Sequence, residues 1–184
     1  MLEALLDSAP ARVSAAAPAS LAELATFPGA PDERVLAILR GIPEVECLLR
    51  GGLVASWHSS FGSLHSRRWH RVAYTKSLLI TPLNDVTEQP SERAFVAQAR
   101  DISLSGISFC HPQPLASRKV VVRFRAEDPI AGEGILAVLR WCRFRRDGCY
   151  QSGGQFLRRA PREADGAVHW ERLAPAITGC FPAS

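Results

Sequence analysis

The sequence lacks the long apolar runs that would place it in a membrane. No apolar stretch approaches the roughly 20 residues that a spanning helix needs, and no basic region precedes an apolar segment at the N-terminus. We therefore predict a soluble, cytoplasmic protein with no membrane insertion.

Cysteine pairs at the spacing of metal or redox sites are also missing. The five cysteines are widely separated without a C-x-x-C pair, and the histidines are scattered. We therefore expect reduced thiols and no metal site. Cys142 and Cys149 flank a predicted turn and could approach each other across a hairpin, although a reducing cytosol argues against a stable bond.

Motifs of common enzymes are absent as well. The chain contains no G-x-S-x-G, Walker, dinucleotide-binding or H-E-x-x-H motif, and its acidic residues are dispersed. Asp101, Ser103 and a distant histidine could be combined into a triad, but such combinations arise in most chains of this length. We predict that the protein is not an enzyme and needs no cofactor.

The composition fits one compact domain with appendages. The chain has 184 residues, of which 47% are hydrophobic and 22% are charged, which is enough apolar material for a core. Its net charge of +4 is too small to indicate a polybasic partner but is compatible with an anionic ligand. Arginines cluster in the second two-thirds of the chain, so the basic character is concentrated there.

Local patterns divide the chain into four parts. Residues 1–30 are rich in Ala, Pro and Ser and predict a poorly ordered or weakly helical arm. Residues 31–64 predict a helical extension, with one helix starting after Pro31 and a second ending before two glycines. Residues 65–160 predict a β domain, and 161–184 a terminal helix or tail.

Within the β domain the apolar residues alternate, as they do in half-buried strands. Pro, Gly and polar residues separate these stretches, and Asp147-Gly148 is typical of a hairpin turn. The aromatic residues Trp141 and Phe144 fall in one such stretch, and we expect them in the core rather than at a ligand. The alternating stretches are 72–80, 95–100, 107–109, 120–125, 135–144 and 149–157. Five or six antiparallel strands with short turns predict a small barrel or sandwich.

Two short polar motifs border these strands. The first is an R-x-x-x-R segment just before the first strand, and the second is a D-x-S-x-x-G segment between the next two. Either pattern alone is common in unrelated surfaces and turns, but the pair in this order is more specific. Their residues are Arg67, Arg68 and Arg71 in the first motif and Asp101, Ser103 and Gly106 in the second.

The two motifs together resemble those of the PilZ family. The predicted closing hairpin, with Gly153 and Phe156, extends the resemblance over about 67–158 and leaves the N-terminal third unexplained. The resemblance implies a mainly β fold: a six-stranded antiparallel PilZ-type barrel with a C-terminal helix. It also implies a receptor for the bacterial second messenger cyclic di-GMP that regulates motility, exopolysaccharide synthesis or virulence through an unidentified protein effector.

The residue types suit this ligand. The planar fork of Arg67 or Arg71 can donate paired hydrogen bonds to a phosphate or to O6 and N7 of guanine, and Arg68 adds a phosphate or stacking contact. Asp101 can accept from N1–H and N2–H of guanine, which would select guanine over adenine. Ser103 can donate to a phosphate or brace the turn, and Gly106 allows a close approach that a Cβ would block.

Two alternatives to a nucleotide receptor remain. A PilZ-like adaptor could act through protein contacts alone. Such an adaptor would be expected to lack the motif arginines, which are present here. A small basic barrel could bind single-stranded nucleic acid, but exposed aromatics at strand period are not evident here, so no nucleic acid is expected as a partner.

Overall fold

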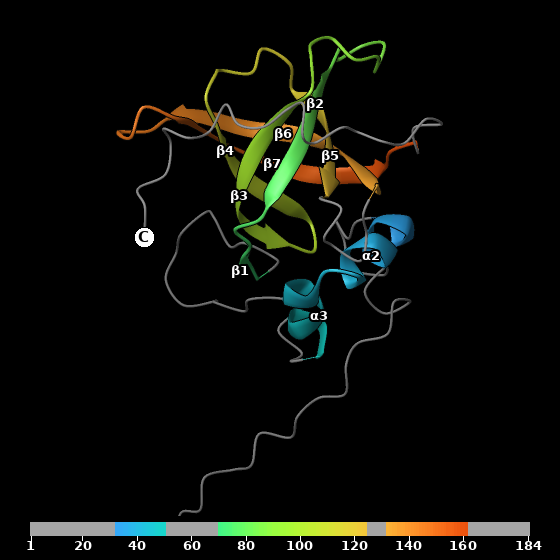
Figure 1. Cartoon of the computed structure of the whole chain (residues 1–184). Helices are drawn as coiled ribbons and strands as arrows, with labels where there is room; N and C mark the ends of the chain where they lie inside the picture. The colour runs from blue at the N-terminus through green and yellow to red at the C-terminus, as the bar shows by residue number, and fades with distance from the viewer. Residues whose placement is uncertain (1–31, 51–69, 125–131, 162–184) are drawn as a thin grey trace, which may run out of the picture.

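The computed structural model describes residues 32–50, 70–124 and 132–161 (Figure 1). Two short helices come first, α2 (Glu33–Arg40) and α3 (Pro43–Arg50). The strands within these ranges are β1 (Val72–Ala73), β2 (Ser77–Leu83), β3 (Phe95–Ser103), β4 (Gly106–His111), β5 (Lys119–Phe124), β6 (Gly134–Phe144) and β7 (Tyr150–Arg159). Neither described helix has the length and apolarity needed to cross a bilayer.

The strands form a closed barrel. Their order is β1-β3-β2-β5-β6-β7-β4, every pair is antiparallel, and a further pairing of β3 with β4 joins the two sides of the sheet. Strands β2 to β7 therefore make a barrel of six strands, to which β1 adds a short extra piece beside β3. Closure pairs strand edges that would otherwise be exposed. The predicted fold class, a mainly β protein with a six-stranded antiparallel barrel, is confirmed.

The first predicted strand is interrupted. A single strand was expected over 72–80, whereas β1 and β2 pair separately with β3. Between them, the amide of Tyr74 donates to Arg100 O (3.2 Å) and the amide of Ala99 donates to Lys76 O (3.0 Å). Ser77 lies four residues after Ala73, whereas its partner Gln98 lies three residues before Asp101, so the segment between β1 and β2 carries one extra residue and the register shifts.

Both predicted N-terminal helices are confirmed. The carboxylate of Asp32 caps α2 by accepting from the amide of Arg34 at 2.7 Å, and Gly41 forms the C-cap. The apolar positions of α2 recur at helical spacing on one face, so that face is buried.

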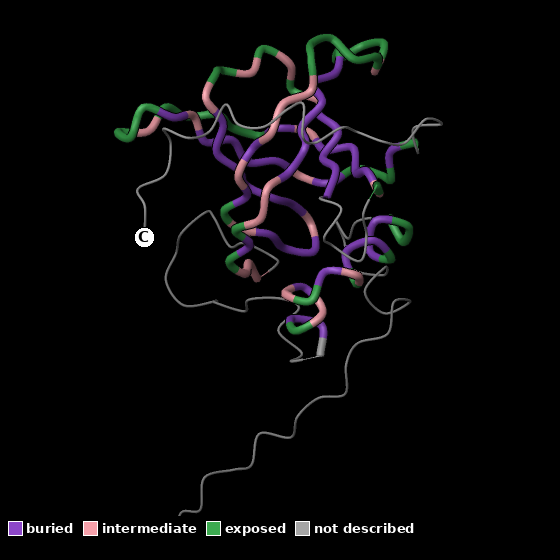
Figure 2. Tube along the Cα trace, viewed as in Figure 1, coloured by how far each residue is buried: buried purple, intermediate pink, exposed green. Residues whose placement is uncertain are grey.

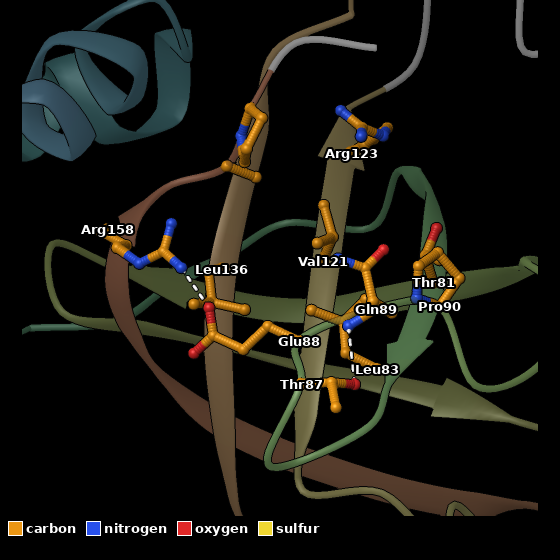
Figure 3. Close-up of a pocket in the computed structure, with 12 residues that line it drawn as sticks. Thr81, Leu83, Thr87, Glu88, Gln89, Pro90, Val121, Arg123, Leu136 and Arg158 are labelled. Atoms are coloured by element: carbon orange, nitrogen blue, oxygen red, sulfur yellow. Dashed lines mark hydrogen bonds and ion pairs between the residues drawn. The ribbon is translucent and has the colours of Figure 1, made fainter.

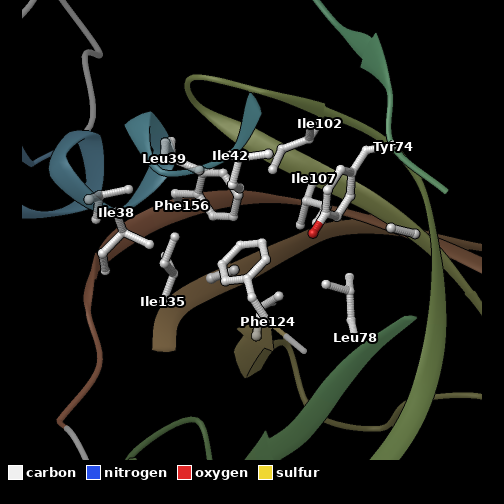
Figure 4. Packing of buried hydrophobic residues seen from close by; sticks show 14 of the residues in the cluster. Ile38, Leu39, Ile42, Tyr74, Leu78, Ile102, Ile107, Phe124, Ile135 and Phe156 are labelled. Atoms are coloured by element: carbon white, nitrogen blue, oxygen red, sulfur yellow. The ribbon is translucent and has the colours of Figure 1, made fainter. Parts of the chain in front are cut away.

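The helices and the barrel share one hydrophobic core. Ile38, Leu39 and Ile42 pack with Phe124, Ile135 and Phe156 at one end of the barrel (Figure 4). Burial follows the barrel wall and the inner helix faces (Figure 2). The helices therefore cover an opening of the barrel.

Some predictions concern residues outside the described ranges. The arm over 1–30 and the terminal helix after residue 161 are among them. Cys47, Cys110 and Cys142 are free thiols, so Cys142 does not bridge to Cys149. Cys149 is buried and disulfide-bonded, so the prediction of reduced thiols is wrong for this cysteine.

Candidate functional site

The two motifs meet beside β1. Ala73 pairs with Asp101 of β3, which brings Arg71, two residues earlier, next to the same carboxylate. A guanidinium nitrogen of Arg71 donates to Oδ1 of Asp101 in an ion pair. Their side chains are 27% and 32% exposed, so both remain open to solvent on the barrel surface.

The second oxygen of the Asp101 carboxylate has its own partner. Ser108 Oγ on β4 donates to Asp101 Oδ2 at 2.7 Å, and the two residues are direct partners in the β3–β4 register. Ser108 is fully buried. Two donors, one from the residue before β1 and one from β4, thus fix the carboxylate, and its remaining lone pairs can accept from a ligand.

Ser103 lies in the turn between β3 and β4. Its side chain is buried, its Oγ donates to Gly106 O at 3.3 Å, and it accepts from the amide of Ser105 at 3.3 Å. Of the two roles open from the sequence, these bonds correspond to bracing the turn.

Gly106 stands where two strands approach closely. A Cβ at this position would lie 2.2 Å from the carbonyl oxygen of Gly154 on β7, a distance that no side chain can occupy. Glycine is thus required for β4 to pair with β7 and close the barrel. Its contribution to the site is to hold the turn that joins β4 to β3, the strand that carries Asp101.

The structure therefore brings one arginine of the first motif next to the residues of the second motif. Arg71, Asp101, Ser103 and Gly106 all lie around the β3–β4 turn and its neighbouring strand. Arg67 and Arg68 lie outside the described residues.

Sequence reasoning missed part of this surface. Asp101, Ser108, Gly153 and Trp141 are successive partners across β3, β4, β7 and β6. Opposed residues in antiparallel strands point to the same face, so these four form one row, which we call the Asp101–Trp141 row. Ser108 could have been found from the sequence, because it lies between Ile107 and Phe109, which are both in the core.

The prediction that Trp141 and Phe144 belong to the core is wrong. Trp141 is 38% exposed and Phe144 is 65% exposed. A bulge in β6 between Leu139 and Trp141 turns Trp141 to the outer face, while Leu139 stays in the core. Phe144 lies at the strand end, where it packs edge-on against Tyr150 with ring centroids 5.1 Å apart.

A pocket of about 440 Å³ lies on another part of the barrel (Figure 3). Its floor is apolar, formed by Leu83, Val121, Leu136 and Ala160, and Glu88 bridges Lys119 and Arg158 at its rim. It shares no residue with the Asp101–Trp141 row. Arg123 and Arg158 also line this pocket, but it contains no residue of the two motifs, so the row is the better candidate site.

The chain is similar to known proteins in structure but not detectably in sequence. Neither a protein-family model nor a curated protein matches the sequence. Among solved structures, the chain is similar to the Bacillus subtilis inhibitor of motility (MotI/DgrA), with 14% identity and a TM-score of 0.40. The match covers 64% of this chain and 52% of the other, so this chain spans about half of that protein's length.

Proposed function

We propose that this protein is a PilZ-type receptor for cyclic di-GMP. It has no catalytic activity and transmits the binding signal to a protein effector. The observation that carries the proposal is the contact of Arg71 with Asp101, which unites two motifs that lie 30 residues apart. If the two motifs resembled those of the family only by chance, nothing would require their residues to be in contact.

The chemistry of the pair supports a guanine nucleotide. Arg71 is partly exposed and can exchange its contact with Asp101 for a phosphate or for O6 and N7 of guanine. The carboxylate of Asp101, held by Ser108, then remains as an acceptor for N1–H and N2–H of the base. Adenine lacks this pair of donors, so the site should prefer guanine.

A route for the signal starts at β1. Val72, next to Arg71, packs against the core that the barrel shares with the helices, and α3 contacts β1. Lys76, just after β1, pairs with Glu44 of α3 at 3.6 Å. A ligand that draws Arg71 away from Asp101 would move this segment and so shift α3, presenting a changed surface to the effector.

Isothermal titration with cyclic di-GMP tests the proposal. Truncating one partner of a desolvated charge pair costs roughly 2 to 5 kcal/mol, so Arg71→Ala should weaken binding by about thirtyfold or more. Arg93→Ala is the matched control, because it removes the same charge from an exposed loop before β3, eight residues before Asp101. Cyclic di-AMP should bind more weakly than cyclic di-GMP.

The assignment fails if the parent protein does not bind cyclic di-GMP, or if Arg71→Ala and the parent titrate alike. Retention of an effector by a protein that does not bind nucleotide would favour the adaptor function instead. Recovering the nucleotide unchanged after incubation is the expected result for a receptor, whereas a hydrolysed product would indicate an enzyme. Burial raises the pKa of Cys110, which keeps this thiol protonated and unsuited to nucleophilic attack at neutral pH.

A second candidate function is binding of single-stranded nucleic acid. Exposed Trp141 and Phe144 beside several arginines favour it, since such barrels combine aromatic platforms with cationic grooves. Competition separates the two: a receptor site for cyclic di-GMP should ignore oligonucleotides, whereas a nucleic-acid groove should bind them more tightly as their length increases.

A further inference from the structure

The Asp101–Trp141 row ends in an aromatic ring that rests on the barrel wall. A Cβ on Gly153 would lie 2.3 Å from Cζ2 of Trp141, so the indole occupies the space above this glycine. The ring thus lies against β7 instead of extending freely, while 38% of the residue stays exposed. Because this ring is held in place, little side-chain entropy remains to be lost when it stacks on a planar group. The Arg143 guanidinium lies over the ring and must move aside for a base to stack there.

Cations on β6 flank this ring. The guanidinium of Arg143 lies 5.1 Å from the centroid of the Trp141 ring, and Arg143 is held by Gln151 Oε1 at 3.0 Å. On the other side of Trp141, Arg140 donates to Gln155 Oε1 at 2.8 Å. Both glutamines come from β7 on the same face as Gly153. The ring is therefore accompanied by two positioned donors for an anion.

The length of the row sets the size of a ligand that uses both ends. Asp101 and Trp141 are three strand spacings apart, roughly 14 Å along the sheet. One guanine nucleotide held by Asp101 cannot also stack on Trp141 at this separation. A dinucleotide has a second base and a second phosphate and can occupy both ends.

We propose that Trp141 is a stacking platform for the second base of the dinucleotide, with Arg140 and Arg143 beside its phosphates, while Asp101 holds the first guanine. This inference rests on the proposed function and adds to it the reason for selecting a dinucleotide over a mononucleotide. The residues that carry it are Trp141, Gly153, Arg140 and Arg143, which the paired motifs do not include.

Titrations of cyclic di-GMP and of GMP test this platform. Stacking on one aromatic side chain contributes about 1 to 3 kcal/mol, so Trp141→Ala should weaken cyclic di-GMP binding by about five- to 150-fold. Trp141→Phe should retain most of the affinity. GMP, which needs only the Asp101 end, should bind both variants as it binds the parent protein.

Phe144→Ala is the matched control, because Phe144 is an exposed aromatic three residues further along β6 and outside the row. It should bind cyclic di-GMP like the parent. Thermal melting establishes that each variant is folded, and Trp141→Phe provides the readout if the alanine variant is not.

The outcomes separate this inference from the proposed function. If cyclic di-GMP binds the parent and requires Arg71, but Trp141→Ala and Trp141→Phe bind it unchanged, the platform is wrong and the receptor stands. Equal losses for GMP and cyclic di-GMP would also overturn the platform. If the parent binds no cyclic di-GMP, both proposals fall together.

Discussion

Ser108 donates its hydroxyl to Asp101 across the β3–β4 pair, at 2.7 Å. The contact exists because a bulge in β3 between Ala99 and Asp101 reverses the strand's alternation. Ala99 points into the core, and without the bulge Asp101 would follow it there. A charge buried in that core would be strongly unfavourable, so the bulge allows the carboxylate to occur in the strand at all.

The hydrogen bond from Ser108 to Asp101 predicts that replacing Ser108 and replacing Ser103 will affect ligand binding differently. Ser108→Ala leaves Asp101 less constrained and should weaken cyclic di-GMP binding by about tenfold or more, since hydrogen bonds to charged groups contribute about 1.5 to 3 kcal/mol. Ser103→Ala removes a brace of the turn and should lower the free energy of unfolding by about 1 kcal/mol with a smaller effect on binding. Calorimetric titration and urea denaturation of both variants measure this contrast, which the reverse pattern would contradict.

Gly106 predicts a steric cost. In Gly106→Ala the new methyl would meet Gly154 O at 2.2 Å, so β4 and β7 must separate. We expect the free energy of unfolding to fall by about 1 to 3 kcal/mol, as in other overpacked sites, or by more.

Gly148→Ala is the comparison for Gly106→Ala. No atom lies within 4 Å of a Cβ at Gly148, but its φ of +82° makes an L side chain strained, at about 1 to 2 kcal/mol. Chemical denaturation of the two variants should show the larger loss, and a reduced cyclic di-GMP affinity, for Gly106→Ala. A Gly106 variant as stable as the parent protein would show that the strands separate without cost.

His111 predicts a dependence of stability on pH. Burial among Phe95, Phe109 and Tyr150 lowers the pKa of His111 from its ordinary value of 6.5, an effect that the carbonyl of Gln113 only partly opposes. The folded protein therefore binds fewer protons than the unfolded chain. Its stability is complete above pH 6.5 and falls as the pH drops below this value, by at most about 1.4 kcal/mol per pH unit for one proton.

Urea denaturation between pH 7.5 and pH 5.5 checks this dependence. His111→Gln should be less stable than the parent protein at the upper pH but should lose less stability on acidification. The pKa values of Glu88 and Asp147 are lowered from 4.5 and 3.8, so both carboxyls stay ionised throughout this range. Identical slopes for variant and parent would exclude His111 as the group responsible.

The strands were predictable because apolar alternation is a local property of the chain. Val120, Val122 and Phe124 alternate in sequence and are all buried in β5, and the Asp147-Gly148 turn follows from the conformational freedom of glycine. The start of the first helix after Pro31 was likewise a local signal. Barrel closure also needs β2 to pair with β5 and β4 to pair with β7, which are not consecutive in the chain. These pairings have no local signal and were expected only from the family resemblance.

The sequence by itself determined the strand-forming stretches, the two helices and the residue types of the paired motifs, since each depends on near neighbours in the chain. Only the tertiary structure decided which faces these residues present. Bulges at Arg100 and Arg140 turn Asp101 and Trp141 outward, and neither bulge has a signal in the alternation that it breaks. The extra residue in each strand is accommodated by a shift in register with the next strand of the chain, and the folded barrel sets that register.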